Sequence, residues 1–128
     1  MIRKDYIQRY FDELAKVLAA VLQLKNDLKP TEAEAELNDF STDYLGVTLN
    51  NILKQDSDNL IDFLITKKEF TLTHFKLLED VLYHKYLLDT SDSNLKNHTL
   101  EVLKYLTEND KDFSIERNKR IKGIESIL

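Results

Sequence analysis

Residues 73–88 read THFKLLEDVLYHKYLL, and this stretch indicates the fold class. Its apolar residues recur at steps of three and four, which is the period of one face of an α-helix. A second apolar stripe runs beside the first, so we expect the helix to pack on more than one side and to lie centrally. Thr71 or Thr73 is the expected N-cap. The first stripe holds Phe75, Leu78, Leu82 and Tyr86, and the second holds Leu77, Val81 and Leu88.

Two further helices are predicted after this one. The polar residues 89–93 form a turn, and the next apolar stripe extends a helix to about Asn109, so the short connection predicts an antiparallel hairpin. Ser114 is the expected N-cap of the last helix, and Phe113 is expected to pack back on it as a hydrophobic staple. The predicted inner face of that last helix holds Ile115, Ile121, Ile124 and Leu128.

The residues before position 71 also show helical patterns. A first helix, capped by Asp5 and ending near Lys25, carries an apolar face and a second stripe beside it, so we expect it to be central as well. Its main face holds Ile7, Phe11, Leu14, Leu18 and Val21.

A second helix is predicted to begin after Pro30 and to end at Gly46. Thr31 and Glu34 have the spacing of a capping box, and Gly46 is suited to a left-handed C-terminal stop. Residues 49–53 and 60–65 then predict either two short helices or one broken helix. The predicted core face of the second helix holds Ala33, Leu37, Phe40 and Tyr44.

The composition agrees with these patterns. The chain has 128 residues, 42% of them hydrophobic and 32% charged, with only 2 Gly and 1 Pro. Such a chain is rich in helix formers and long enough to bury a core. We therefore predict an all-α fold in which residues 1–128 form a single domain of about six antiparallel helices, arranged as a bundle or as tetratricopeptide-like hairpins.

Several functional classes are disfavoured by the sequence. The chain has no cysteine, which rules out disulfides and thiolate sites and suits the reducing cytoplasm. No apolar run is long enough for a membrane span, and no signal-peptide cleavage site follows the first apolar residues. The net charge of -5 argues against nucleic acid as the main partner.

One group of residues could carry metal or acid–base chemistry. If the predicted hairpin turns near Ser91, His84 and His98 lie at similar heights, with Asp80 and Glu101 one helical turn away from them. Such a group could hold a divalent metal or share a proton. The simpler interpretation is that these are polar side chains bonded to their neighbours, because no ligand spacing of a known metal motif is present. We therefore expect a non-enzyme without cofactors.

Charge is distributed unevenly along the chain. Between Thr31 and Asp62 there are eight acidic residues and one basic residue, Lys54. We call the exposed face predicted for the second helix the acidic stripe. We call the positively charged segment of the last helix the basic run. The two could meet within one chain or across a homodimer, or each could be a solvated face. The acidic stripe holds Glu32, Glu36, Asp39 and Asp43, and the basic run holds Arg117, Lys119, Arg120 and Lys122.

Three segments carry a family resemblance. Residues 5–9 (DYIQR), 100–109 (LEVLKYLTEN) and 113–118 (FSIERN) together resemble a group of small uncharacterised bacterial helical proteins. The hairpin over residues 73–109 resembles a tetratricopeptide unit in architecture, but it lacks that repeat's small residues and closing proline. The resemblance implies an all-helical fold and assigns no functional residue.

The sequence therefore predicts a non-catalytic helical module that takes part in protein interaction or has a structural role, with another protein or a second copy as its partner. The alternative is the metal or acid–base site at Asp80, His84, His98 and Glu101.

Overall fold

The computed structural model describes the backbone of residues 4–126 and the side chains of residues 7–126. Within this range the chain is all-helical and contains no β-strand, which confirms the predicted fold class. In this part of the chain no helix is both long enough and apolar enough to cross a membrane. The helices, in order, are α1 (Lys4–Asn26), α2 (Pro30–Phe40), α3 (Leu49–Lys54), α4 (Ser57–Thr66), α5 (Leu72–Leu88), α6 (Ser93–Asn109) and α7 (Ile115–Ser126), with a π-helical turn η1 (Ser41–Leu45) after α2.

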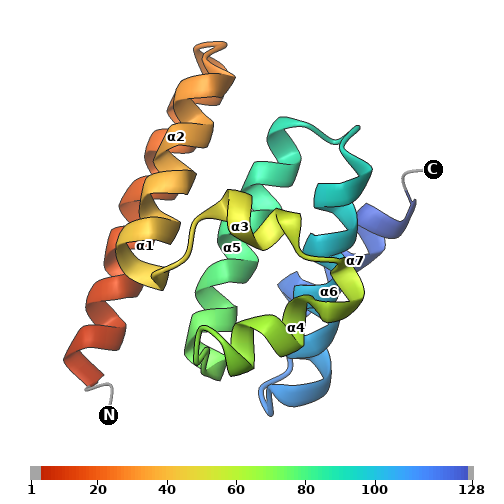
Figure 1. Ribbon diagram of the computed structural model, residues 1–128. Helices are drawn as coiled ribbons and strands as arrows, with labels where there is room; N and C mark the ends of the chain where they lie inside the picture. The colour runs from red at the N-terminus through yellow and green to blue at the C-terminus, as the bar shows by residue number, and fades with distance from the viewer. Residues whose placement is uncertain (1–3, 127–128) are drawn as a thin grey trace.

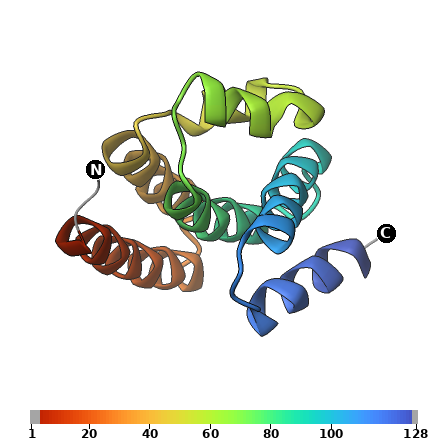
Figure 2. The same ribbon diagram turned by 90° about the horizontal axis from the view of Figure 1, so that it is seen from below.

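Helix α5 lies at the centre of the fold. Figure 2 shows α3 and α4 on one side of α5 and α6, with α1 and α7 on the other side. Figure 1 shows that α1 and α2 form an antiparallel hairpin at one edge, and that α5 and α6 form a second hairpin. Both stripes predicted for α5 face neighbours. Seven of its residues are buried: Phe75, Leu77, Leu78, Glu79, Val81, Leu82 and Tyr86.

Helix α1 is less central than we predicted. Only Leu14 and Val21 are buried among its described residues, and Leu22 is 61% exposed. The reason is that α2 and α5 cover two flanks of α1 and leave the third to solvent (Figure 1). Asp5 lies inside α1 and is not its N-cap, and its side chain is outside the described residues.

The described residues form seven α-helices, whereas about six were predicted, and the connections account for the difference. Gln55 and Asp56 have extended backbones, so α3 and α4 are two separate helices. Gly46 has a φ of 72°, the left-handed stop predicted for the end of the second helical segment. The capping box at Thr31 was wrong, because Pro30 is already the first residue of α2 and Lys29 is its N-cap.

The later helices begin at the predicted polar residues. The N–H of Leu95 donates to Asp92 Oδ1 at 3.0 Å, and the N–H of Arg117 donates to Ser114 Oγ at 3.1 Å. The predicted inner face of α7 was partly wrong. Phe113 and Ile115 are 79% and 64% exposed, so neither packs on the core, and Leu128 lies outside the described residues.

The N-terminus of α5 carries a histidine whose protonation weakens the cap. Thr71 donates its N–H to Nδ1 of His74 at 3.0 Å, and the imidazole stacks on Phe70 with ring centroids 5.1 Å apart. Burial lowers the pKa of His74 below its ordinary value of 6.5. The neutral His74 imidazole therefore contributes its full stabilisation above pH 6.5. This stabilisation is lost as the pH falls through the lowered pKa, because His74 takes up a proton more readily in the unfolded chain than in the folded one.

We expect His74→Gln to remove this pH dependence, because glutamine also accepts a hydrogen bond at this capping position but does not titrate. Urea unfolding measured at intervals below pH 7 should show a smaller loss of stability in the variant than in the wild-type chain. Equal losses in both proteins would contradict the role given to His74.

Candidate functional site

The four residues of the metal or acid–base hypothesis make separate contacts. Nδ1 of His84 lies 2.8 Å from the backbone oxygen of Asp80, and the Asp80 carboxylate accepts from Arg120 at 2.6 Å. His98 is buried, with Nδ1 2.8 Å from the Asn94 oxygen and Nε2 2.6 Å from the Gln55 oxygen. Both His98 nitrogens therefore face backbone carbonyls, and neither is open to a metal. Glu101 is half-buried, and residues 7–126 contain no group of three or more side chains placed to hold a metal ion.

The basic run does not form an exposed stripe. Arg117 and Arg120 are 7% and 8% exposed, whereas Lys119 and Lys122 are on the surface. Arg117 Nε donates to Glu79 Oε1 at 2.8 Å, and Arg120 Nη1 donates to Glu79 Oε2 at 2.9 Å. Glu79 of α5 thus binds two guanidinium groups of α7, and we call these three residues the buried ion cluster.

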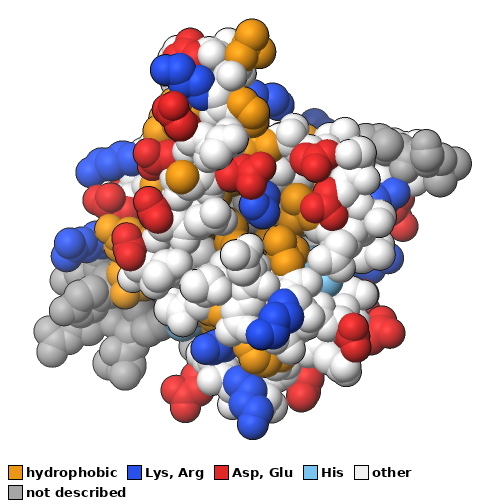
Figure 3. All heavy atoms as spheres, turned by 45° about the horizontal axis from the view of Figure 1, so that its top comes forward, with side chains coloured by type: hydrophobic (Ala, Val, Ile, Leu, Met, Phe, Trp, Pro, Cys, Tyr) orange, Lys and Arg blue, Asp and Glu red, His pale blue; other side chains and the backbone are white. Residues whose placement is uncertain are grey.

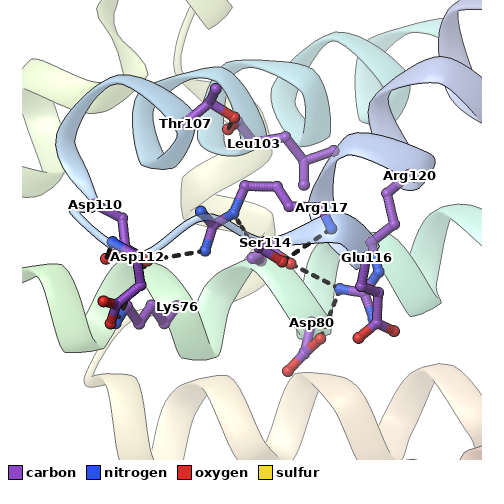
Figure 4. Close-up of polar contacts among 11 residues, drawn as sticks. Lys76, Asp80, Leu103, Thr107, Asp110, Asp112, Ser114, Glu116, Arg117 and Arg120 are labelled. Atoms are coloured by element: carbon purple, nitrogen blue, oxygen red, sulfur yellow. Dashed lines mark hydrogen bonds and ion pairs between the residues drawn. The ribbon is translucent and has the colours of Figure 1, made fainter.

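Other carboxylates surround the buried ion cluster. Figure 4 shows Arg117 directed from α7 toward Asp110 in the α6–α7 connection, and Arg120 directed toward Asp80 of α5. Arg117 Nη2 donates to Asp110 at 3.2 Å, and Arg120 also lies 4.3 Å from the centre of the Tyr83 ring. Arg120 Nε is buried without a hydrogen-bond partner among the described residues. The cluster therefore fixes α7 to the rest of the fold.

The environment favours the ionised forms of Asp110 and Arg120. The N–H of Asp112 donates to the Asp110 carboxylate and lowers its pKa, burial opposes this shift, and Arg117 and Lys76 lower the pKa further. Burial by itself would lower the pKa of Arg120, but its carboxylate neighbours raise it above its ordinary value. The arrangement has the features of a structural ion network, in which each charge is satisfied by partners of the same chain.

The acidic stripe lies away from the basic run. Its four residues, Glu32, Glu36, Asp39 and Asp43, are all exposed on α2 and η1. Figures 1 and 2 place α2 and α7 on opposite sides of the α5–α6 hairpin. Of the three alternatives left open for the two surfaces, pairing within one chain is therefore not what the described residues show, and the physical reason is that Arg117 and Arg120 are bound to Glu79.

An apolar groove lies between α1 and the C-terminal half of α5. Its first hollow, about 330 Å³, is lined mainly by aliphatic side chains, and the exposed Leu22 forms part of its wall. A second hollow of about 430 Å³ continues from it toward the α1–α2 connection, since Lys25 and Leu88 line both. We call the two together the α1–α5 groove. Its lining residues are Leu18, Ala19, Val21, Leu22, Lys25, Leu28, Pro30, His84, Leu87 and Leu88.

The tip of the α1–α2 hairpin forms the end of this groove. Leu28 is 86% exposed there, and Figure 3 shows hydrophobic side chains on the surface of the tip beside charged ones. Sequence analysis did not identify the groove. The available signal was the apolar stretch from Val17 to Leu22, which exceeds what one buried face of a helix requires.

A third hollow, about 220 Å³, lies at the α6–α7 connection and is bordered by Asp110, Ser114 and Arg117. Two of its lining residues, Asp110 and Arg117, are already paired in the ion network described above, so the α1–α5 groove is the better candidate for a binding site. The resemblance to small bacterial helical proteins stays a prediction. The chain matches no protein-family model, no curated protein and no solved structure.

Proposed function

We propose that this chain is a non-catalytic helical module that binds another protein through the α1–α5 groove. The observation that carries the proposal is Leu22, which is 61% exposed in the wall of a mainly aliphatic hollow. Exposed apolar surface beside a concave site is typical of surfaces that receive a partner's side chains. An apolar groove is one established type of receptor for an amphipathic helix, which places its apolar face in the groove.

The other assignments are proposals with less support. The metal or acid–base alternative is weakened because both His98 nitrogens face carbonyl oxygens and Asp80 is paired with Arg120. A second copy of the chain is an alternative partner, although Arg117 and Arg120 are too buried to meet its acidic stripe. We also propose a cytoplasmic location, which the absence of cysteine supports. A tetratricopeptide-like role for the α5–α6 hairpin is a further proposal.

We expect Leu22→Glu to weaken groove-dependent binding by tenfold or more, which corresponds to about 1.4 kcal/mol, because it places a carboxylate in an apolar wall. The probe is a displayed library of helical peptides selected on the wild-type chain, and Kd values follow from fluorescence anisotropy of the selected peptides. Leu22 is exposed, so the free energy of unfolding should change by no more than about 0.5 kcal/mol.

Ile115→Glu is the matched control. Ile115 is exposed to a similar extent, 64%, but lies at the start of α7 away from the groove. Selected peptides should bind this variant within about twofold of wild type. A library that yields no peptide with reduced affinity for Leu22→Glu would contradict the proposed function.

A further inference from the structure

We propose that the occupant of the α1–α5 groove is an amphipathic helix with acidic residues beside its apolar face, held at one end by Leu28. This inference rests on the proposed function and adds to it the chemistry of the partner. Three features of the described residues support it: the spacing of the groove residues on α1, the backbone conformation of Leu28, and the unpaired charges at the rim.

The wall formed by α1 has the dimensions of a helix-binding site. Leu18, Leu22 and Lys25 follow one another at steps of four and three, so they line one edge over about 10 Å, or two helical turns. Leu87 and Leu88 of α5 face them across the hollow. A partner helix with apolar residues at i, i+3 or i+4, and i+7 would place its side chains at matching intervals.

Leu28 has an unusual backbone for its residue type. Its φ is 61°, in the left-handed region, and it follows α1 at the position where a Schellman motif normally has glycine. The two bonds of that motif are present, from the N–H of Lys29 to the Leu24 oxygen at 2.8 Å and from the N–H of Leu28 to the Lys25 oxygen at 3.1 Å. Gly46 fills the corresponding left-handed position after η1.

The side chain of Leu28 gains almost no burial in return for this strain. It is 86% exposed and borders the second hollow of the groove. A leucine in the left-handed conformation that is also exposed to solvent costs backbone strain and contributes little burial to the stability of the chain. Contact with a partner at the end of the groove would give its side chain the burial that the free chain does not provide.

The charges at this end favour an acidic partner. Lys25 lines both hollows and Lys29 follows Leu28, and the described residues include no ion-pair partner for either side chain. Asp27 accepts from the Gln23 amide at 3.1 Å, and Asp89 accepts from the Ser91 hydroxyl at 2.6 Å. Asp27 and Asp89 therefore each have a hydrogen-bond partner in their own chain, while the two ammonium groups are open to carboxylates of a partner.

The test uses a library of 18-residue helical peptides with leucines fixed at i, i+4 and i+7 and the flanking positions randomised among Glu, Lys, Gln and Ala. The library is selected on the wild-type chain and counter-selected on Leu22→Glu. We expect Glu to be enriched over Lys beside the leucines. The Kd of the enriched peptides should rise about tenfold in Lys25→Glu/Lys29→Glu, because two attractive contacts become repulsive.

Two further variants sharpen the result. Lys54→Glu/Lys67→Glu makes the same change in net charge on the α3–α4 side of the molecule, and binding should stay within about twofold. Leu28→Gly should weaken binding about fivefold or more while the melting temperature stays the same or rises, because glycine adopts the left-handed conformation without strain.

The outcomes separate this inference from the proposed function. One contrary result is that the selected peptides depend on Leu22 and yet are enriched in Lys, and another is that they bind equally well to Lys25→Glu/Lys29→Glu. Either result would overturn the proposal of an acidic partner helix and would leave the groove as a binding site. Self-association in sedimentation that Leu22→Glu abolishes would make a second copy the occupant and would also overturn it. The absence of any Leu22-dependent peptide would remove both proposals.

Discussion

Replacing Glu79 with glutamine should lower the free energy of unfolding by about 3 kcal/mol. Breaking a buried ion pair by neutralising one partner costs about 3–5 kcal/mol, because the other charge remains buried without compensation. Here one carboxylate serves two guanidinium groups, Arg117 at 2.8 Å and Arg120 at 2.9 Å. We expect the lower end of the range because Asp110 and Asp80 stay within reach of the two arginines.

The matched control is Glu116→Gln. Glu116 also accepts from Arg120, at 3.1 Å, but its side chain is 77% exposed, so its loss should cost less than about 1 kcal/mol. Urea unfolding gives both values, and hydrogen exchange should show the amides of α7 losing protection first in Glu79→Gln. A cost for Glu79→Gln no larger than that for Glu116→Gln would contradict the buried ion cluster.

A third variant separates charge from packing. Replacing the whole buried ion cluster by apolar residues, as in Glu79→Leu/Arg117→Met/Arg120→Met, should cost less than Glu79→Gln, since the two buried guanidinium groups and the carboxylate between them are removed together and Asp110 keeps Lys76 as a partner at 3.5 Å. A large loss of stability in the triple variant would indicate that the shape of the long arginine side chains, and not only their charge, holds α7 in place.

Local sequence rules predicted most of the helices. The two stripes of α5, the polar turn at residues 89–93 and the cap at Ser114 depend on periodicity and on side-chain bonds within a few residues, which a sequence displays directly. The separation of α3 from α4 was left open, because it depends on the extended backbone of Gln55 and Asp56. That conformation follows from tertiary packing, with the Gln55 oxygen contacting His98 of α6.

The sequence analysis did not predict that Arg117 and Arg120 are buried, because a run of charged residues normally indicates a solvent-exposed helix face. A signal was present: Arg117, Ile121 and Ile124 follow one another at steps of four and three, so the arginine continues the apolar stripe of α7. The identity of the carboxylate that meets them could not be predicted. Glu79 lies 38 residues from Arg117, and only the packing of α5 against α7 brings them together.

The groove could not be predicted for a related reason. A helical pattern reports how much apolar surface a helix carries, but not whether the rest of the chain covers it. The second apolar stripe of the first helix suggested a helix packed on more than one side, whereas α2 and α5 cover only part of α1. The distinction between Leu14, 2% exposed, and Leu22, 61% exposed, arises entirely from the placement of the neighbouring helices.

That distinction leads to the second large effect, which is expected for Leu14→Ala. Leu14 belongs to the continuous core that includes residues of α2, α5 and α6, and its side chain is almost wholly removed from solvent. Truncation loses the burial of the side chain and leaves a cavity that the packed helices fill only in part, so we expect a cost of about 2–5 kcal/mol in the free energy of unfolding.

Leu22→Ala is the same chemical change two turns further along the same helix, so helix propensity alters equally in both variants and the difference between them reports burial alone. Its cost should be below about 0.5 kcal/mol in urea unfolding. Peptide binding should show the opposite ranking of the two variants. Leu22→Ala should raise the Kd of the selected peptides, whereas Leu14→Ala should leave this Kd unchanged under conditions where the variant is folded. Equal costs of unfolding would mean that α1 does not pack through Leu14, and the wall of the α1–α5 groove would then lose its support.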